Sequence, residues 1–146
     1  MTHSPALRLY PVFPRNNRIA LRDTVLPTGG GPNATTPIFA PAGTLFDTSF
    51  ATLHRAKTTW GPDAHDFRPS RWDTVKPSPF EFMPFGAGAR QCVAQRKVMM
   101  ETAYVVVRMV QEFRGIGSVD ARAYEARVAL TAKNTNGCVV VLTPAD

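Results

Sequence analysis

One short stretch of the sequence gathers residue types that suit a flat, anionic, metal-bearing ligand. It reads FMPFGAGARQC and runs from Phe82 to Cys92. Gly86 and Gly88 allow tight backbone turns and leave no Cβ in the way of an approaching group. Arg90 carries a rigid fork of donors that fits a carboxylate or a phosphate. The stretch therefore predicts a binding site rather than a buried packing cysteine.

Cys92 is the residue of this stretch with the strongest chemistry. A helix is expected to start just after it, and unpaired N–H groups at a helix N-terminus stabilise negative charge. The same donors favour a thiolate over a thiol, and Phe85 can shield the sulfur from water. Haem fits this set, because its iron takes a thiolate and its propionate takes an arginine.

The long helix expected at residues 94–113 must hold this stretch in place. Its apolar residues cover more than one stripe, which predicts a helix buried on most sides. A chain of 146 residues has little mass to bury such a helix. We therefore expect a partner, or a part of the protein outside this chain, to cover it.

The rest of the chain reads as short elements punctuated by 13 prolines. Residues 60–84 show no sustained period and predict an ordered meander pinned by side chains. The remaining expectations are a helix end at 5–10, a hairpin of 18–21 with 24–27, strands at 37–40 and 44–50, and a terminal hairpin of 126–133 with 138–143 across Asn136-Gly137.

Composition limits the function classes. A hydrophobic share of 44% and a charged share of 19% indicate one globular domain. The net charge of +6 comes from scattered residues without a basic run, which argues against nucleic-acid binding. Cys92 and Cys138 form no CxxC pair, and the three histidines do not complete a zinc site. A disulfide between the two cysteines stays open, and the first residues contain no targeting or membrane-anchoring stretch.

Several motifs in the same order resemble those of one family. FGAGARQCVA (85–94) resembles the haem-binding signature F-x-x-G-x-R-x-C-x-G/A of the cytochrome P-450 monooxygenases. ALRLYP resembles the end of the family's E-x-x-R helix, with Arg8 as the arginine, and FRPSRW (67–72) resembles its meander motif, with Arg71 as the arginine. The resemblance covers nearly the whole chain, and residues 26–43 are similar to the fungal alkane and fatty-acid hydroxylase branch.

The resemblance implies the fold class and a set of site residues. The fold is expected to be mostly α with small β-sheets (α+β), as the proximal-side, C-terminal part of the family's domain across residues 1–146. Cys92 becomes the proximal thiolate ligand of a haem b iron, and Arg90 pairs with a propionate. Phe85 and Gly88 shape the loop, and Ala94 stands where glycine is commoner. Arg18 is carried over as a second propionate contact.

The match fails at one position that matters electrostatically. The glutamate of E-x-x-R would stand at position 5, which is Pro5 here. Without it, Arg8 and Arg71 face each other with no carboxylate between them, and unpaired buried charge is costly. We expect a loosened meander unless Asp63, Asp66 or Asp73 takes the place of the glutamate.

The resemblance also implies an activity, partners and a location. The family oxidises apolar small molecules with molecular oxygen and takes electrons from an NADPH-dependent reductase at the endoplasmic reticulum membrane. The oxygen-activation half of the domain is missing, so the chain is expected to be a truncated, inactive fragment with no catalytic residues and no membrane anchor. One alternative is a non-catalytic module that binds haem or a redox partner. Another is a hydrolase using Cys92 and His54, although nothing in the sequence brings the two together.

Overall fold

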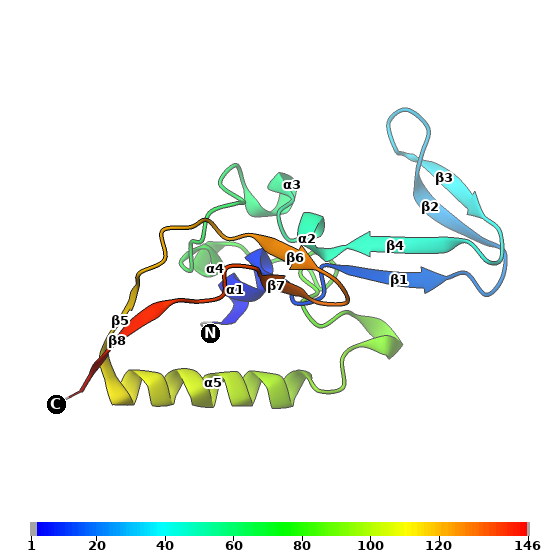
Figure 1. The fold of residues 1–146 in the computed structure, drawn as a ribbon. Coiled ribbons are helices and arrows are strands. Elements are labelled where there is room, and N and C mark those ends of the chain that lie inside the picture. The colour runs from blue at the N-terminus through cyan, green and yellow to red at the C-terminus, as the bar shows by residue number, and fades with distance from the viewer. Residues whose placement is uncertain (1–2, 146) are drawn as a thin grey trace. The chain divides into compact units, whose positions relative to one another are not determined.

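The structure is a computed structural model that describes residues 3–145. The chain divides into two compact units, shown in Figure 1. Residues 15–49 form one unit, and the segments on either side of them form the other. The β-sheets of both units are two-stranded and antiparallel.

The larger unit holds all the helices described. Its short helices are separated by turns, as expected from the prolines, and one long helix, α5, follows them. Its elements are α1 (His3–Leu9), α2 (Phe50–Leu53), α3 (Lys57–Trp60), α4 (Arg71–Thr74), a 3-10 turn (Gly88–Arg90), α5 (Gln95–Glu112), β5 (Phe113–Ser118), β6 (Ala126–Val128), β7 (Ala132–Asn134) and β8 (Val140–Pro144).

The core of this unit lies where α1, α2 and the meander meet. Leu9, Phe50, Trp60 and Ala64 are among its buried apolar residues. The Trp60 and Trp72 rings meet edge to face with centroids 5.4 Å apart, and the Phe82 ring packs against both. Three polar residues, Arg8, His54 and Arg71, are buried in the same region. The meander is thus pinned by side chains, as the sequence predicts.

The smaller unit corrects one predicted pairing. Residues 18–21 and 24–27 do not form a hairpin, because Arg22-Asp23 lacks the left-handed backbone that a two-residue hairpin turn needs. The Asp23 side chain instead accepts a hydrogen bond from the Ala42 N–H at 2.8 Å. The observed pairs are β1 (Arg15–Ile19) with β4 (Leu45–Ser49) and β2 (Thr24–Gly30) with β3 (Thr36–Ala40).

The predicted terminal hairpin across Asn136-Gly137 is also wrong. The Asn134 side chain closes this turn on itself, accepting from the Glu125 and Asn136 N–H groups and donating to the Gly137 carbonyl. Strand pairing therefore stops at Asn134. The hairpin that forms is β6 with β7, and the last strand, β8, pairs with β5.

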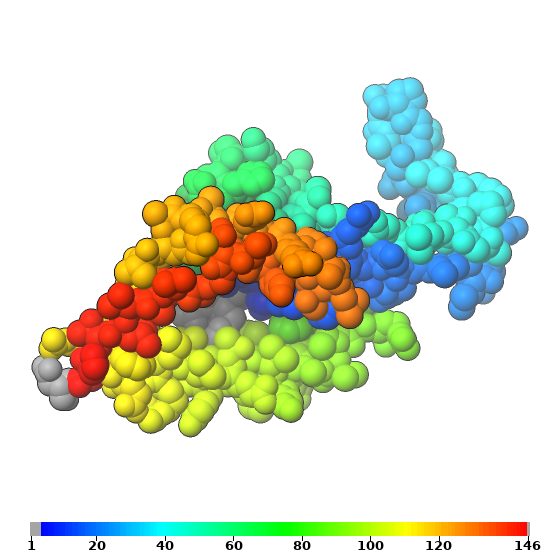
Figure 2. Space-filling model, in the orientation of Figure 1, coloured from blue at the N-terminus to red at the C-terminus, as the bar shows by residue number. Residues whose placement is uncertain are grey.

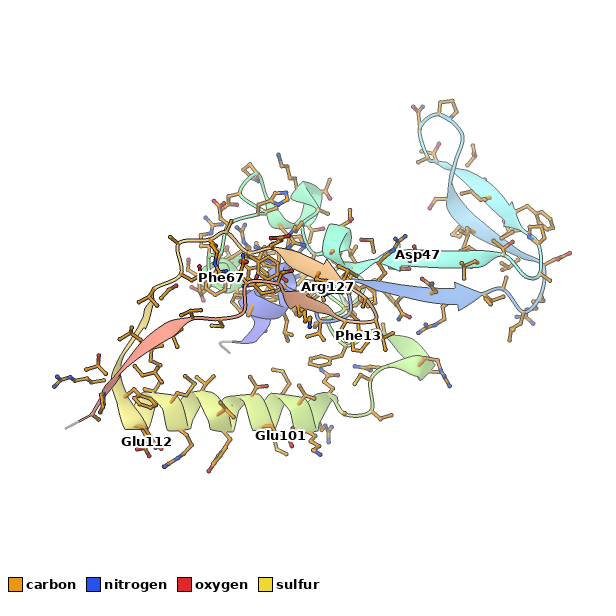
Figure 3. All side chains as sticks on the ribbon, viewed as in Figure 1. Phe13, Asp47, Phe67, Glu101, Glu112 and Arg127 are labelled. Atoms are coloured by element: carbon orange, nitrogen blue, oxygen red, sulfur yellow. The ribbon has the colours of Figure 1, made fainter. Side chains whose placement is uncertain are left out.

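The long helix has the predicted place, and, as expected, this chain does not bury its side chains. No residue of α5 is buried, and Figure 2 shows the helix in yellow-green on the surface of its unit. Figure 3 labels Glu101 and Glu112 on this helix, each in an ion pair with a basic residue four positions earlier. The exposed apolar side chains of α5 are Val98, Met100, Tyr104, Val105, Val106, Val107 and Val110.

The α+β class with small sheets is as predicted. The expected predominance of helix is not observed, because strands and helices occupy similar shares of the described residues. Frequent prolines keep four of the five α-helices to two turns or fewer. Within residues 3–145, no helix is long and apolar enough to cross a membrane.

Candidate functional site

The cysteine loop, residues 85–94, joins the meander to α5. Two hydrogen bonds close it: the Cys92 N–H donates to the Phe85 carbonyl at 3.0 Å, and the Gln91 N–H donates to the Gly88 carbonyl at 3.0 Å. Gly86 and Gly88 have φ angles of 75° and 74°, a backbone region that disfavours other residues. The loop is therefore an ordered turn closed by hydrogen bonds, and Cys92 lies near its C-terminal end.

Both glycines face open space. A Cβ placed on Gly86 or Gly88 would have no atom within 4 Å beyond its chain neighbours. Beside them lies a cavity of about 370 Å³ whose lining includes Phe80, Phe82 and Phe85. The bare backbone next to aromatic rings gives a flat group a surface on which to rest, so the loop fits a planar ligand such as haem.

Cys92 is an exposed free thiol. The first residue of α5 is Gln95 and its N-cap is Ala94, so Cys92 lies just before the helix rather than within its first turn. The Gln91 side chain donates to the Gln95 side chain at 2.7 Å and ties the loop to the helix start. Cys138 is also exposed and free. Within residues 3–145, no three His, Cys, Asp or Glu side chains gather as a metal site.

The two candidate propionate ligands have different surroundings. Arg90 ends the short 3-10 turn of the loop and is exposed, two residues before Cys92. Arg18 lies on β1 in the other unit, where its guanidinium donates to the Asn16 side chain at 2.7 Å and to the Asn17 carbonyl at 2.8 Å. The structure brings Arg90 together with the cysteine, while the role of Arg18 stays a prediction.

Arg8 is held without a carboxylate. Its guanidinium donates to the carbonyls of His54 at 2.9 Å, Ala64 at 2.5 Å and Asp66 at 3.0 Å, and it lies 5.1 Å from the centre of the Trp60 ring. Burial lowers the pKa of Arg8 to about 10, and the positive charges of Arg71 and Arg55 add to this effect. Backbone carbonyls and the face of the Trp60 ring thus provide part of the stabilisation that the expected glutamate would give to the Arg8 charge.

Arg71 is paired with Asp63, one of the three substitutes considered. Its Nη1 donates to the Asp63 carboxylate at 2.7 Å and to the Trp60 carbonyl, and its Nη2 donates to the Asp63 carbonyl at 2.6 Å. The Arg71 guanidinium holds the pKa of Asp63 below its usual value. Arg71 Nε is buried with no hydrogen-bond partner, one donor that the Asp63 pair leaves unsatisfied.

Pro5 stands in the first turn of α1, where a proline removes no helical hydrogen bond. It is buried and lies three positions before Arg8, on the same side of the helix. The site of the expected glutamate is therefore filled by an apolar ring beside the buried arginines. Asp63 supplies the carboxylate from the meander instead.

His54 is a residue of this region whose role the sequence does not reveal. It is fully buried, and its Nε2 accepts a hydrogen bond from the Met83 N–H at 3.0 Å. A ring nitrogen already engaged in this way is not a free base for Cys92, so the structure gives the hydrolase alternative no support. In the sequence, His54 stands beside Arg55 and shortly before the meander, which places it near the candidate site. No motif or spacing predicts its hydrogen bond with Met83.

Comparisons with known proteins show the family of the chain. The family model for cytochrome P450 matches residues 6–133. The chain is 44% identical over 135 residues to cytochrome P450 monooxygenase FPY7 of Fusarium mangiferae, covering 92% of this chain and 26% of that protein. It is 44% identical over 137 residues to cytochrome P450 monooxygenase fsdH of Fusarium heterosporum, covering 94% and 24%. It is 44% identical over 114 residues to cytochrome P450 52A6 of Candida tropicalis, covering 77% and 22%.

The cysteine loop, with open backbone at its glycines beside aromatic rings, is the candidate haem site of this chain. The chain belongs to the cytochrome P450 family. Proteins of this family hold a haem iron through a cysteine thiolate. The chain spans about a quarter of the length of the curated relatives it matches.

Proposed function

We propose that this chain is the haem-thiolate part of a cytochrome P450 monooxygenase, with Cys92 as the proximal ligand of the iron. The observation that carries the proposal is the cysteine loop, in which the Cys92 N–H bonds to the Phe85 carbonyl and both glycines face open space. Phe85 and Gly88 shape this surface, and the N-cap residue, Ala94, is small enough to leave it open. Arg90 binds a propionate.

The proposed chemistry follows from the family. When bound, a haem with a thiolate ligand activates molecular oxygen by favouring O–O cleavage. The contribution of this chain is to present the exposed Cys92 sulfur to the iron at the end of its loop and to neutralise a carboxylate with Arg90. The substrate class of the whole protein is an apolar small molecule, as in the fungal alkane and fatty-acid hydroxylase branch. Its electrons come from an NADPH-dependent reductase at the endoplasmic reticulum membrane.

A second candidate is a non-catalytic module that holds haem or a redox partner. One observation favours it: the apolar side chains of α5 are exposed and open to a partner. Haem binding without substrate oxidation by this polypeptide separates the two candidates. We propose that oxidation needs segments homologous to the remainder of the relatives, so that the chain alone is inactive.

The test is a haem titration of the 146-residue chain, followed by reduction and addition of carbon monoxide. A strongly red-shifted Soret band marks a thiolate-ligated iron. We expect Cys92→Ala to abolish this band and Cys138→Ala, which removes the other exposed thiol, to keep it. Equal bands in the two variants, or no band in the wild-type chain, contradict the assignment of Cys92 in this chain.

A further inference from the structure

His54 links three parts of the larger unit. Its backbone carbonyl accepts a hydrogen bond from Arg8 of α1 at 2.9 Å. Its ring stacks on Phe50 of α2, with centroids 6.0 Å apart, and lies tilted against Phe82 at 5.1 Å. The ring is fully buried, yet neither the proposed haem ligation nor the arginine pairs use it. Packing alone does not require an imidazole here, since an aliphatic side chain would fill the space.

The polar contact of the ring is specific. Nε2 accepts from the Met83 N–H at 3.0 Å, so the neutral ring carries its proton on Nδ1. Among the described residues no group meets the buried Nδ1 at good hydrogen-bond geometry, although the Leu7 and Arg8 backbone carbonyls act to raise the pKa of the ring. Burial, with the charges of Arg55 and Arg8, lowers the pKa of His54 to about 4. The ring is therefore kept neutral, which is the state in which Nε2 can accept.

Met83 leads directly into the cysteine loop. Its carbonyl accepts from the Gly86 N–H at 3.1 Å, and the Phe85 carbonyl accepts from the Cys92 N–H at 3.0 Å. Before Met83, the segment has another anchor, the Thr59 hydroxyl donating to the Glu81 carboxylate at 2.8 Å. Between Pro84 and Cys92, the hydrogen bonds of the structure join loop residues to one another, to Met83 or to Gln95. The Met83 amide is thus the last point at which the core holds the chain before the cysteine.

We propose that His54 is a positioning residue for the cysteine loop: its Nε2 holds the Met83 amide and so fixes where the loop leaves the core. The proposal rests on the proposed function only in that the positioned cysteine is the haem ligand. Protonation of Nε2 turns the acceptor into a donor that faces the Met83 N–H, and the anchor is lost. Arg8 and Arg55 are the charged groups that face His54, and both oppose this protonation, while Phe50 and Phe82 add none.

Hydrogen exchange of backbone amides in the haem-free 146-residue chain tests the proposal. His54→Leu keeps the bulk of the side chain but removes the acceptor, whereas His54→Gln supplies an amide oxygen near the position of Nε2. Thr59→Val is the matched control, because it removes the neighbouring anchor at Glu81 and leaves Met83 alone. We expect exchange at Met83, Gly86 and Cys92 to rise about five- to tenfold in His54→Leu, to return toward the wild-type rate in His54→Gln, and to stay unchanged in Thr59→Val.

Three outcomes overturn the proposal. The first is an exchange rate at Met83 that is unchanged in His54→Leu. The second is a raised exchange rate that persists in His54→Gln. The third is an equal rise at core amides such as Trp60 and Ala64, which would make His54 a packing residue only. If His54→Leu does not fold, the wild-type chain still decides: ¹⁵N shifts of the imidazole must show Nε2 unprotonated at pH 7, and a proton there refutes the proposal. Because no haem is present, a failure of haem binding is a separate result.

Discussion

Removing the Arg71 guanidinium is expected to destabilise the meander strongly. Arg71 is 1% exposed and donates to the Trp60 carbonyl and to both the carboxylate and the carbonyl of Asp63. Breaking a buried pair by removing one partner costs about 3–5 kcal/mol. Three features move the Arg71→Ala value to the lower end: the Asp63 side chain is 29% exposed, it keeps Arg68 as a partner at 3.1 Å, and the repulsion between Arg71 and Arg8 disappears. We therefore expect a loss of about 3 kcal/mol of unfolding free energy.

Urea unfolding followed by tryptophan fluorescence measures this loss. Trp60 and Trp72 are the two tryptophans of the chain, and their rings meet beside the arginine. With an m-value of about 2 kcal/mol per M, a loss of about 3 kcal/mol lowers the urea midpoint by about 1.5 M. Arg71→Lys keeps the charge but loses the two-pronged fork, so its midpoint should fall between those of the wild type and Arg71→Ala.

Arg68→Ala is the matched control, because Arg68 pairs with the same Asp63 carboxylate from a half-exposed position. Exposed pairs contribute little, so its midpoint should stay near that of the wild type. The reasoning is refuted if Arg71→Ala and Arg68→Ala have midpoints within about 0.3 M of each other, which is less than about 1 kcal/mol. The buried fork would then not be what pins the meander.

Three further predictions follow from the same region. Pro5→Glu places a carboxylate one turn before Arg8 and should raise the unfolding free energy by about 1–3 kcal/mol, because an unsatisfied buried donor gains a partner; a lower urea midpoint would contradict this. His54 has a pKa lowered to about 4, so the unfolded chain binds a proton between about pH 6.5 and 4 that the folded chain does not. Stability, fully present above that window, should fall as the pH is lowered through it, and a slope unchanged in His54→Gln would argue against His54 as its source. Arg90→Gln should weaken haem affinity about tenfold in the titration, since a charge-assisted contact is lost, whereas Arg96→Gln on α5 should leave the affinity unchanged. Equal effects of the two substitutions would indicate a nonspecific effect of positive charge rather than a propionate contact.

The sequence predicted the local geometry of the cysteine loop better than the strand pairing. Cys92, Gly86, Gly88 and Arg90 lie within one short loop, so their spacing alone brings them together, and the loop closes as expected of glycines with positive φ. The β1–β4 pair joins residues far apart in the sequence, and nothing near Arg22 signals it. Similarly, Asn136-Gly137 is a strong hairpin signal, but the Asn134 side chain uses the hydrogen bonds of the turn and ends the pairing.

Burial could be predicted for one element and not for another. The apolar residues of α5 predict a buried helix, yet the described part of the chain leaves them exposed. Hydrophobic periodicity reports which faces need a partner, not whether this chain contains it. For His54, by contrast, no motif predicts burial. The structure buries it, and Met83, which is distant in sequence, donates a hydrogen bond to its ring.

The presence of Pro5 at the position of the expected glutamate also explains the arrangement of the buried arginines. A single carboxylate between Arg8 and Arg71 would serve both, but of these two arginines Asp63 hydrogen-bonds only Arg71. Arg8 is then left to backbone carbonyls and the Trp60 ring, which carry partial charges and satisfy its donors without neutralising it. The lowered pKa of Arg8 and the unsatisfied Nε of Arg71 are the two signs of that imbalance. A carboxylate restored at position 5 would act on both at once, so Pro5→Glu and Arg71→Ala probe one electrostatic network from opposite sides.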